Sequence, residues 1–132
     1  DNFATRYALN TACLRQRRPL VTGAVIRMEG QVMTFPFDAE PLPPCYRCLY
    51  REAPDAEESE RCAVTGVLGP AAGLIGTLQA AEAVKRLAGI DEGLAGRLLL
   101  ADALTMDFRT IRLTPDPQCP ACSALRTPSA GH

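Results

Sequence analysis

Hydrophobic and polar residues recur along the chain in patterns that predict two helices. Over residues 2–17 alanines repeat every four positions, and Phe3 lies one helical turn before Tyr7. Asp1 is a suitable N-cap for this helix, and the basic run RQRR at 15–18 closes it with cations that suit the C-terminal end of the helix dipole. The first predicted helix is therefore bounded at both ends.

The second predicted helix, residues 67–89, is the strongest pattern in the chain. Positions 70–76 contain no polar side chain, so we expect the first half of this helix to be buried on all sides. Gly73 and Gly76 each cost about 0.5–1 kcal/mol relative to alanine in a helix interior, which suggests that another backbone passes close by. Polar residues follow in the second half, where Glu82 and Arg86 are spaced to pair on one stripe.

Four short runs predict strands. The run at 20–26 is apolar and β-branched, which is typical of a buried strand, and a turn at Glu29-Gly30 leads to its partner at 31–35. A second pair, at 97–102 and 108–113, is joined by a short turn. The order helix, two strands, loop, long helix and two strands predicts an α/β domain with a mixed sheet flanked by helices.

Length and charge narrow the class of protein. The 132 residues fit one domain, which we expect to end at residue 125 and to be followed by a tail or linker at 126–132. Residues 50–62 carry five acids and little to bury, so we expect a mobile loop there. The chain starts with Asp1, which suggests the C-terminal part of a longer protein.

A net charge of −1 gives no reason to expect a nucleic-acid partner. No apolar run is long enough to span a membrane, and the absence of an export signal points to the cytoplasm.

Four cysteines form two CxxC pairs, Cys45 with Cys48 and Cys119 with Cys122. Each CxxC turn presents two thiolates to one ion, and two such turns complete a closed tetrahedral zinc site. The pairs of a zinc ribbon lie about 15–20 residues apart, whereas here the separation is far greater. We therefore expect a structural zinc ion that joins two distant loops and stabilises the fold by closing a long loop.

The alternatives to zinc are disulfides, free or redox-active thiols and an iron–sulfur cluster. Disulfides are disfavoured by the missing export signal, and a redox CxxC motif is usually single and starts a helix. Iron–sulfur ligands more often gather within one stretch of sequence. Cys13 fits the apolar pattern of the first helix as a buried residue. Cys62, beside Arg61, is either an incidental loop thiol or an accessible nucleophile, and both interpretations stay open.

Six motifs in order resemble the C-terminal half of the MoeB/ThiF family: DNFATR, PLVTGAVIRMEGQV, PCYRCL, GVLGPAAGLIGTLQAAEAVKRLAG, RLLLADALTMDFRTIRL and CPAC. The resemblance runs from Asp1 to about Cys122. Members are bacterial relatives of ubiquitin-activating enzymes that adenylate small ubiquitin-like sulfur-carrier proteins, commonly as homodimers. The resemblance implies the C-terminal half of a Rossmann-type α/β domain with a zinc site made of four cysteines.

The resemblance also implies roles for single residues. Asp1 corresponds to the catalytic acidic residue at the Mg-ATP site, and Asp1 and Asn2 together inherit the binding of ATP and magnesium. The four CxxC cysteines correspond to the structural zinc ligands. Cys62 corresponds to a loop cysteine that, in some members, links covalently to the activated carrier.

Part of the family's pattern has no counterpart in this chain. The GxGxxG phosphate-binding turn and further ATP-contacting basic residues precede the DN motif in the family, and here nothing supplies them. We therefore expect the chain alone to be inactive. The expected function is a part of an adenylyltransferase that activates a MoaD- or ThiS-like carrier for molybdopterin or thiamine biosynthesis. The alternative is a zinc-stabilised protein-binding module without catalysis.

Overall fold

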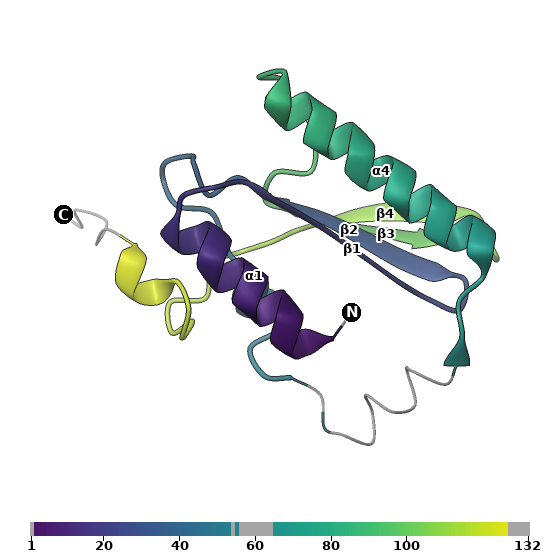
Figure 1. Cartoon of the computed structure of the whole chain (residues 1–132), viewed down its shortest axis with the longest axis horizontal. Coiled ribbons are helices and arrows are strands. Elements are labelled where there is room, and N and C mark those ends of the chain that lie inside the picture. The colour runs from purple at the N-terminus through teal and green to yellow at the C-terminus, as the bar shows by residue number, and fades with distance from the viewer. Residues whose placement is uncertain (1, 54, 56–64, 127–132) are drawn as a thin grey trace. The chain divides into compact units, whose positions relative to one another are not determined.

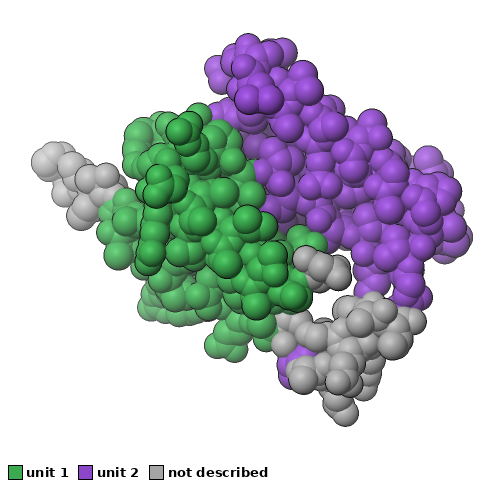
Figure 2. All heavy atoms as spheres, in the orientation of Figure 1, with its two compact units in different colours: residues 1–20, 35–53, 113–132 green, residues 21–34, 54–112 purple. Residues whose placement is uncertain are grey.

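The computed structural model describes residues 2–53, 55 and 65–126 (Figure 1). These residues divide into two compact units, shown in green and purple in Figure 2. Unit 1 comprises residues 1–20, 35–53 and 113–132, and unit 2 comprises 21–34 and 54–112. Most of the stretch expected to form a mobile loop lies outside the described residues, as does most of the expected tail.

Helix α1 of unit 1, Phe3–Arg15, is shorter than predicted by one residue at its start and two at its end. Its N-cap is Asn2 rather than Asp1, because the Asn2 side-chain oxygen accepts a hydrogen bond from the Thr5 N–H at 2.8 Å. Cys13, expected to be buried, is only half-buried. The prediction of this helix is otherwise confirmed.

Aromatic rings pack α1 against the short helix α2, Tyr46–Leu49, of the same unit. The Tyr7 and Tyr46 ring centroids are 5.9 Å apart, and those of Tyr46 and Tyr50 are 5.0 Å apart. Tyr46 is 2% exposed and therefore lies at the centre of this core. Edge-to-face and tilted ring pairs of this kind contribute about 0.5–1.5 kcal/mol each beyond their buried area.

Four strands form one sheet in the order β1-β2-β3-β4: Leu20–Ile26, Glu29–Phe35, Arg97–Asp102 and Asp107–Arg112. The pairs β2–β3 and β3–β4 are antiparallel, and β1 joins β2 through two residues, which permits only an antiparallel pair. The expected α/β fold is confirmed. We expected a sheet with both parallel and antiparallel strand pairs. Among the described residues, parallel pairing is limited to two isolated bridges, Arg27 with Val67 and Thr34 with Ala95.

The turn between β1 and β2 lies at Arg27 and Met28, not at Glu29-Gly30 as predicted. Arg27 has a positive φ of 55°, whereas Gly30 lies within β2 and pairs with Ala101. A Cβ at position 30 would lie 2.3 Å from Ile75 Cγ1 of the overlying helix. The glycine is therefore required by the close approach of a helix, and not by a turn.

Helix α4, Gly69–Leu87, lies along one face of the sheet (Figure 1). The expected burial of its first half on all sides is wrong, because a helix on a sheet buries only the stripe that faces the strands. Ala71 and Ile75 are buried, whereas no described atom outside the adjoining backbone of the helix lies within 4 Å of the position a Cβ would take at Gly73 or Gly76. A buried cluster within unit 2 joins α4 to the sheet and contains Val32, Ile75, Leu94 and Ala101.

Glu82 is the one charged residue of α4 that the structure buries, with 5% of its surface exposed. Its carboxylate accepts hydrogen bonds from the Thr34 hydroxyl at 2.8 Å and from the Leu94 N–H at 2.9 Å. Its ion-pair partner is Lys85, one turn along the helix, in place of the predicted Arg86. The carboxylate thus ties α4 to β2 and to the turn that precedes β3.

Replacing Gly30 by alanine is expected to lower the free energy of unfolding by about 1–3 kcal/mol, because the new methyl group would overlap the buried Ile75 side chain. The matched control is Gly76→Ala, which adds the same methyl group where nothing lies within 4 Å. It should raise the free energy of unfolding by about 0.5–1 kcal/mol through improved helix propensity. Urea denaturation measures both, and equal stability of the two variants would contradict the packing of α4 on β2.

Candidate metal centre

Two tight turns of unit 1 carry the four predicted ligands. Cys45 is the N-cap of α2 and Cys48 lies in its first turn, so that the Cys45 N–H donates to the Cys48 sulfur at 3.4 Å. Cys119 and Cys122 flank the turn that leads into the 3-10 helix η1, Ser123–Leu125. Short turns place both sulfurs of each pair on the same side of the backbone.

The four sulfurs converge on one point. All four Sγ atoms lie within 4.8 Å of one another. The Cys45–Cys119 distance is 3.6 Å, the Cys48–Cys122 distance is 3.4 Å, and the Cys45–Cys48 distance is 3.9 Å. Tetrahedral coordination with bonds of about 2.3 Å separates ligand sulfurs by about 3.8 Å. The residues therefore fit a single metal ion, and all four cysteines are free of disulfides.

Burial and mutual hydrogen bonding shift the pKa values of the Cys45 and Cys48 thiols in opposite directions in the absence of a metal. Hydrogen bonds with Cys122 and Cys48, followed by burial, raise the pKa of the Cys45 thiol. Hydrogen bonds from Cys122 and Cys45 lower the pKa of Cys48 in spite of its partial burial. Metal binding must displace the remaining protons, because the thiolate is the ligand, and it therefore couples to pH.

Helix α1 fixes the first CxxC turn through two contacts that sequence reasoning missed. Asn10, which is fully buried, accepts a hydrogen bond from the Tyr46 N–H at 3.0 Å. The Tyr7 hydroxyl donates to the Tyr50 carbonyl at 2.8 Å. A signal was present: the spacing of Phe3, Tyr7 and Leu14 defines one helix face, and Asn10 falls on it as a polar interruption.

The second CxxC turn is fixed by two arginines. Arg51 donates to the Gln118 carbonyl at 3.3 Å and lies 3.7 Å from the Asp116 carboxylate. Arg126 donates to the Leu42 and Pro43 carbonyls and to the Cys122 sulfur, the last at 3.5 Å. Arg126 was expected to be the first residue of the tail, and only residues 127–132 beyond it lie outside the described residues.

Of the other predicted site residues, the structure describes Asn2 alone, and it is not part of this centre. Asn2 is exposed and serves as the cap of α1. Asp1 and Cys62 lie outside the described residues, so their predicted roles in catalysis and ATP binding stay predictions. The metal centre is the part of the predicted site that the structure assembles.

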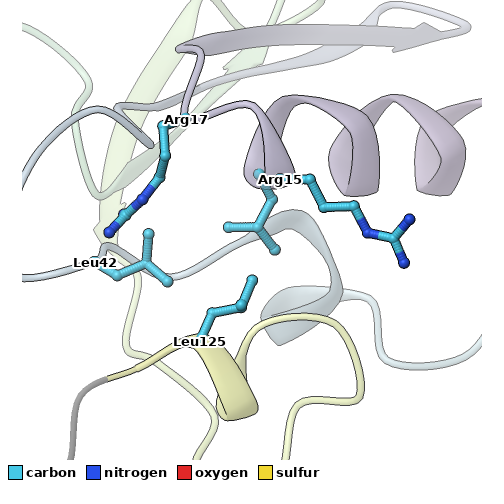
Figure 3. A pocket seen from close by; sticks show the side chains of 5 residues that line it. Arg15, Arg17, Leu42 and Leu125 are labelled. Atoms are coloured by element: carbon cyan, nitrogen blue, oxygen red, sulfur yellow. The ribbon is translucent and has the colours of Figure 1, made fainter.

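One pocket of about 190 Å³ lies near the metal centre within unit 1, lined by Leu14, Arg15, Arg17, Leu42 and Leu125 (Figure 3). In Figure 3 the Arg15 side chain points away from Leu42 and Leu125. Arg17 is occupied by the Phe37 carbonyl and the Glu40 carboxylate. The pocket therefore presents leucine side chains and no converging polar groups.

A larger hollow of about 570 Å³ lies over strands β2 to β4 of unit 2. Three carboxylates line it in register across adjacent strands, namely those of Glu29, Asp102 and Asp107. Asp102 Oδ1 accepts hydrogen bonds from the Leu104 and Thr105 N–H groups, at 2.9 and 3.4 Å. This carboxylate therefore shapes the β3–β4 turn.

Among the residues that the structure describes, none of the helices combines the length and the apolar character that a membrane-spanning helix needs.

Comparison with known proteins identifies relatives over nearly the whole chain. The model of the ThiF family matches residues 1–121. The SAMP-activating enzyme E1 of Haloferax volcanii is 48% identical over 122 residues, which cover 92% of this chain and 44% of that protein. The adenylyltransferase and sulfurtransferase MOCS3 of Anopheles gambiae is 44% identical over 128 residues, covering 96% of this chain and 28% of that protein. The chain thus spans less than half the length of these relatives.

A solved structure resembles the fold. The crystal structure of E. coli MccB superposes with a TM-score of 0.71, covering 98% of this chain and 39% of that chain. Its sequence is only 15% identical, so the likeness concerns the fold alone.

Proposed function

Because this chain belongs to the ThiF family, we propose that it is part of an ATP-dependent adenylyltransferase that activates the C-terminal glycine of a ubiquitin-like sulfur-carrier protein. The observation that carries the proposal is the 48% and 44% identity to relatives named as an activating enzyme E1 and an adenylyltransferase. Residues 1–125 form the C-terminal part of the adenylyltransferase domain in this proposal, and a tail or linker follows.

The metal that we propose for the four cysteines is zinc, in a structural role. Four thiolates are a soft ligand set that zinc accepts in a tetrahedron, and such a site leaves no position open for a reacting molecule. Three of the four cysteines are buried, which supports a structural over a catalytic ion. A reducing compartment such as the cytoplasm would keep these thiols available for the metal.

The chemistry proposed for the whole protein is attack by the carrier's terminal carboxylate on the α-phosphate of ATP. The new bond joins a carboxylate oxygen to the α-phosphorus, and pyrophosphate leaves. Bound magnesium supplies charge neutralisation between two anionic reactants. Asp1 and Asn2 are the residues of this chain proposed to bind ATP and magnesium. Cys62 is the proposed nucleophile, whose thiolate would attack the carbonyl carbon of the carrier adenylate and form a thioester with release of AMP.

A homodimer is also part of the proposal, and the outer face of α4 is its suggested seam. Val84 and Leu87 are 62% and 88% exposed, and the glycines of this face leave room for a second backbone to approach.

The carrier proposed is MoaD-like or ThiS-like, so the pathway is molybdopterin or thiamine biosynthesis.

The chain alone is expected not to catalyse carrier-dependent exchange of pyrophosphate into ATP, because it lacks the GxGxxG turn that binds phosphates. The full-length parent is expected to catalyse this exchange with one of the two candidate carriers. Exchange with neither MoaD-like nor ThiS-like carriers by the parent would refute the proposed function. Exchange by the 132-residue chain alone would refute the expected inactivity.

The competing function is a zinc-stabilised protein-binding module without catalysis. A carrier that binds the parent protein with unchanged affinity in the presence and absence of ATP, and without exchange, would favour this module.

A further inference from the structure

Arg126 joins the two CxxC segments outside the ligands themselves and, unlike Arg51, also contacts a ligand sulfur. It lies four residues after Cys122, and its guanidinium reaches back to the segment that leads into the first CxxC turn. One terminal nitrogen donates to the Leu42 carbonyl, and the other donates to the Pro43 carbonyl at 2.7 Å and to Cys122 Sγ at 3.5 Å. A single side chain thus contacts the backbone before one CxxC turn and a ligand of the other.

We propose that Arg126 holds the metal centre closed, as a positioning residue that fixes the second CxxC turn to the Leu42–Pro43 backbone and donates a hydrogen bond to the Cys122 thiolate. The inference rests on the proposed structural metal. It assigns to Arg126 control over how long the ion stays bound.

The shape of the guanidinium explains why arginine suits this position. Its planar fork presents several N–H donors in fixed directions. One side chain therefore donates to three acceptors, and only that side chain loses conformational entropy. An ammonium group on a flexible stem lacks this fork. Lysine at position 126 therefore would keep the charge and lose part of the bonding.

Charge gives Arg126 a second effect. Four thiolates around a divalent ion leave a net negative charge, and a guanidinium in contact with one sulfur offsets part of it. Release of the ion would begin when one thiolate leaves it. Arg126 tethers the Cys122 turn to the Leu42 and Pro43 carbonyls, so a thiolate that left the ion would stay close and bind again. Outer contacts of this kind change metal affinity by about 10–100-fold.

Arg51 provides a matched control for Arg126, because it also fixes the second CxxC turn. It also tethers the chain just before Cys119, through Gln118 and Asp116, but these two contacts involve no sulfur. Its side chain is 52% exposed, and exposed ion pairs contribute about 0.2–1 kcal/mol. Arg51→Gln therefore tests the tether without the thiolate contact.

The experiment loads the 132-residue chain and its variants with zinc and follows transfer of the ion to an excess of a chromogenic chelator. Arg126→Gln is expected to accelerate transfer by about 10–100-fold, and Arg51→Gln by less than about fivefold. An unchanged rate for Arg126→Gln, or equal acceleration by both variants, would overturn the inference. A wild-type chain that binds no zinc would instead refute the proposed metal.

Cobalt substitution separates the thiolate contact from a general loss of structure. In Arg126→Gln the sulfur-to-cobalt charge-transfer band should move to longer wavelength, because a thiolate that loses a hydrogen bond is a better electron donor. In Arg51→Gln the band should stay in place. If Arg126→Gln fails to fold, Arg126→Lys carries the test, and wild-type release by that variant would overturn the role of the fork.

Discussion

Cys119→Ser is expected to lose the bound metal and to lower the thermal midpoint of unfolding by more than about 10 °C. Cys119 is fully buried, and its sulfur lies 3.6 Å from that of Cys45 in the other turn. Without the fourth thiolate the ion no longer joins the two turns, and the unfolded chain regains the entropy of an open loop. For a loop of this length that entropy is worth about 4 kcal/mol. Metal analysis and a thermal melt measure the two effects.

The control for this prediction is Cys13→Ser, the same substitution at a half-buried position of α1. It should retain the metal and shift the midpoint by much less. A chelator should reproduce the effect of Cys119→Ser in the wild-type chain and add little to the variant. A Cys119→Ser chain that kept one equivalent of metal and its original midpoint would show that the four sulfurs do not share an ion.

The second large effect is expected from Glu82→Ala, which should lower the free energy of unfolding by about 3 kcal/mol. The substitution leaves the Thr34 hydroxyl and the Leu94 N–H without their acceptor, and hydrogen bonds to a charged group contribute about 1.5–3 kcal/mol each. The control is Glu92→Ala, which removes a carboxylate that is exposed. Equal losses in the two variants, measured by urea denaturation, would argue against the buried contacts.

The effect of Glu82 should depend on pH in a defined direction. Burial alone would raise the pKa of Glu82, but the contacts with Lys85, the Leu94 N–H and the Thr34 hydroxyl lower it below its usual value of 4.5. A carboxyl group with a lowered pKa stabilises the fold above the unfolded value, and this contribution is lost as the pH falls through the folded pKa. The difference in stability between wild type and Glu82→Ala should therefore be constant near neutral pH and shrink below about pH 4.5.

The sequence predicts the elements and the convergence of the four cysteines well because both depend on spacing. Two CxxC turns restrict their own geometry, so the convergence of Cys45, Cys48, Cys119 and Cys122 follows once one ion is assumed. The strands at 20–26 and 97–102 follow from runs of apolar residues. The burial expected for the first of them is wrong, because β1 lies at the edge of the sheet and all of its residues are only half-buried.

The errors arise where packing between elements decides the outcome. Gly30 reads as a turn residue along the chain, but it is a glycine because Ile75 of α4 passes over it. Glu82 reads as part of a polar stripe, but its partners come from β2 and from the turn before β3, far away in sequence. Such contacts leave no periodic signal within the segment itself, and the same holds for Arg126 at the metal centre.

The two CxxC turns belong to one compact unit, while residues 54–112 of the other unit lie between them in the sequence. An ion shared by both turns therefore acts as a reversible cross-link around an inserted segment. A peptide bond cut anywhere in that segment would leave the two fragments attached through sulfur and metal. Withdrawal of the ion would break this link, whereas a disulfide in the same position would require a reductant.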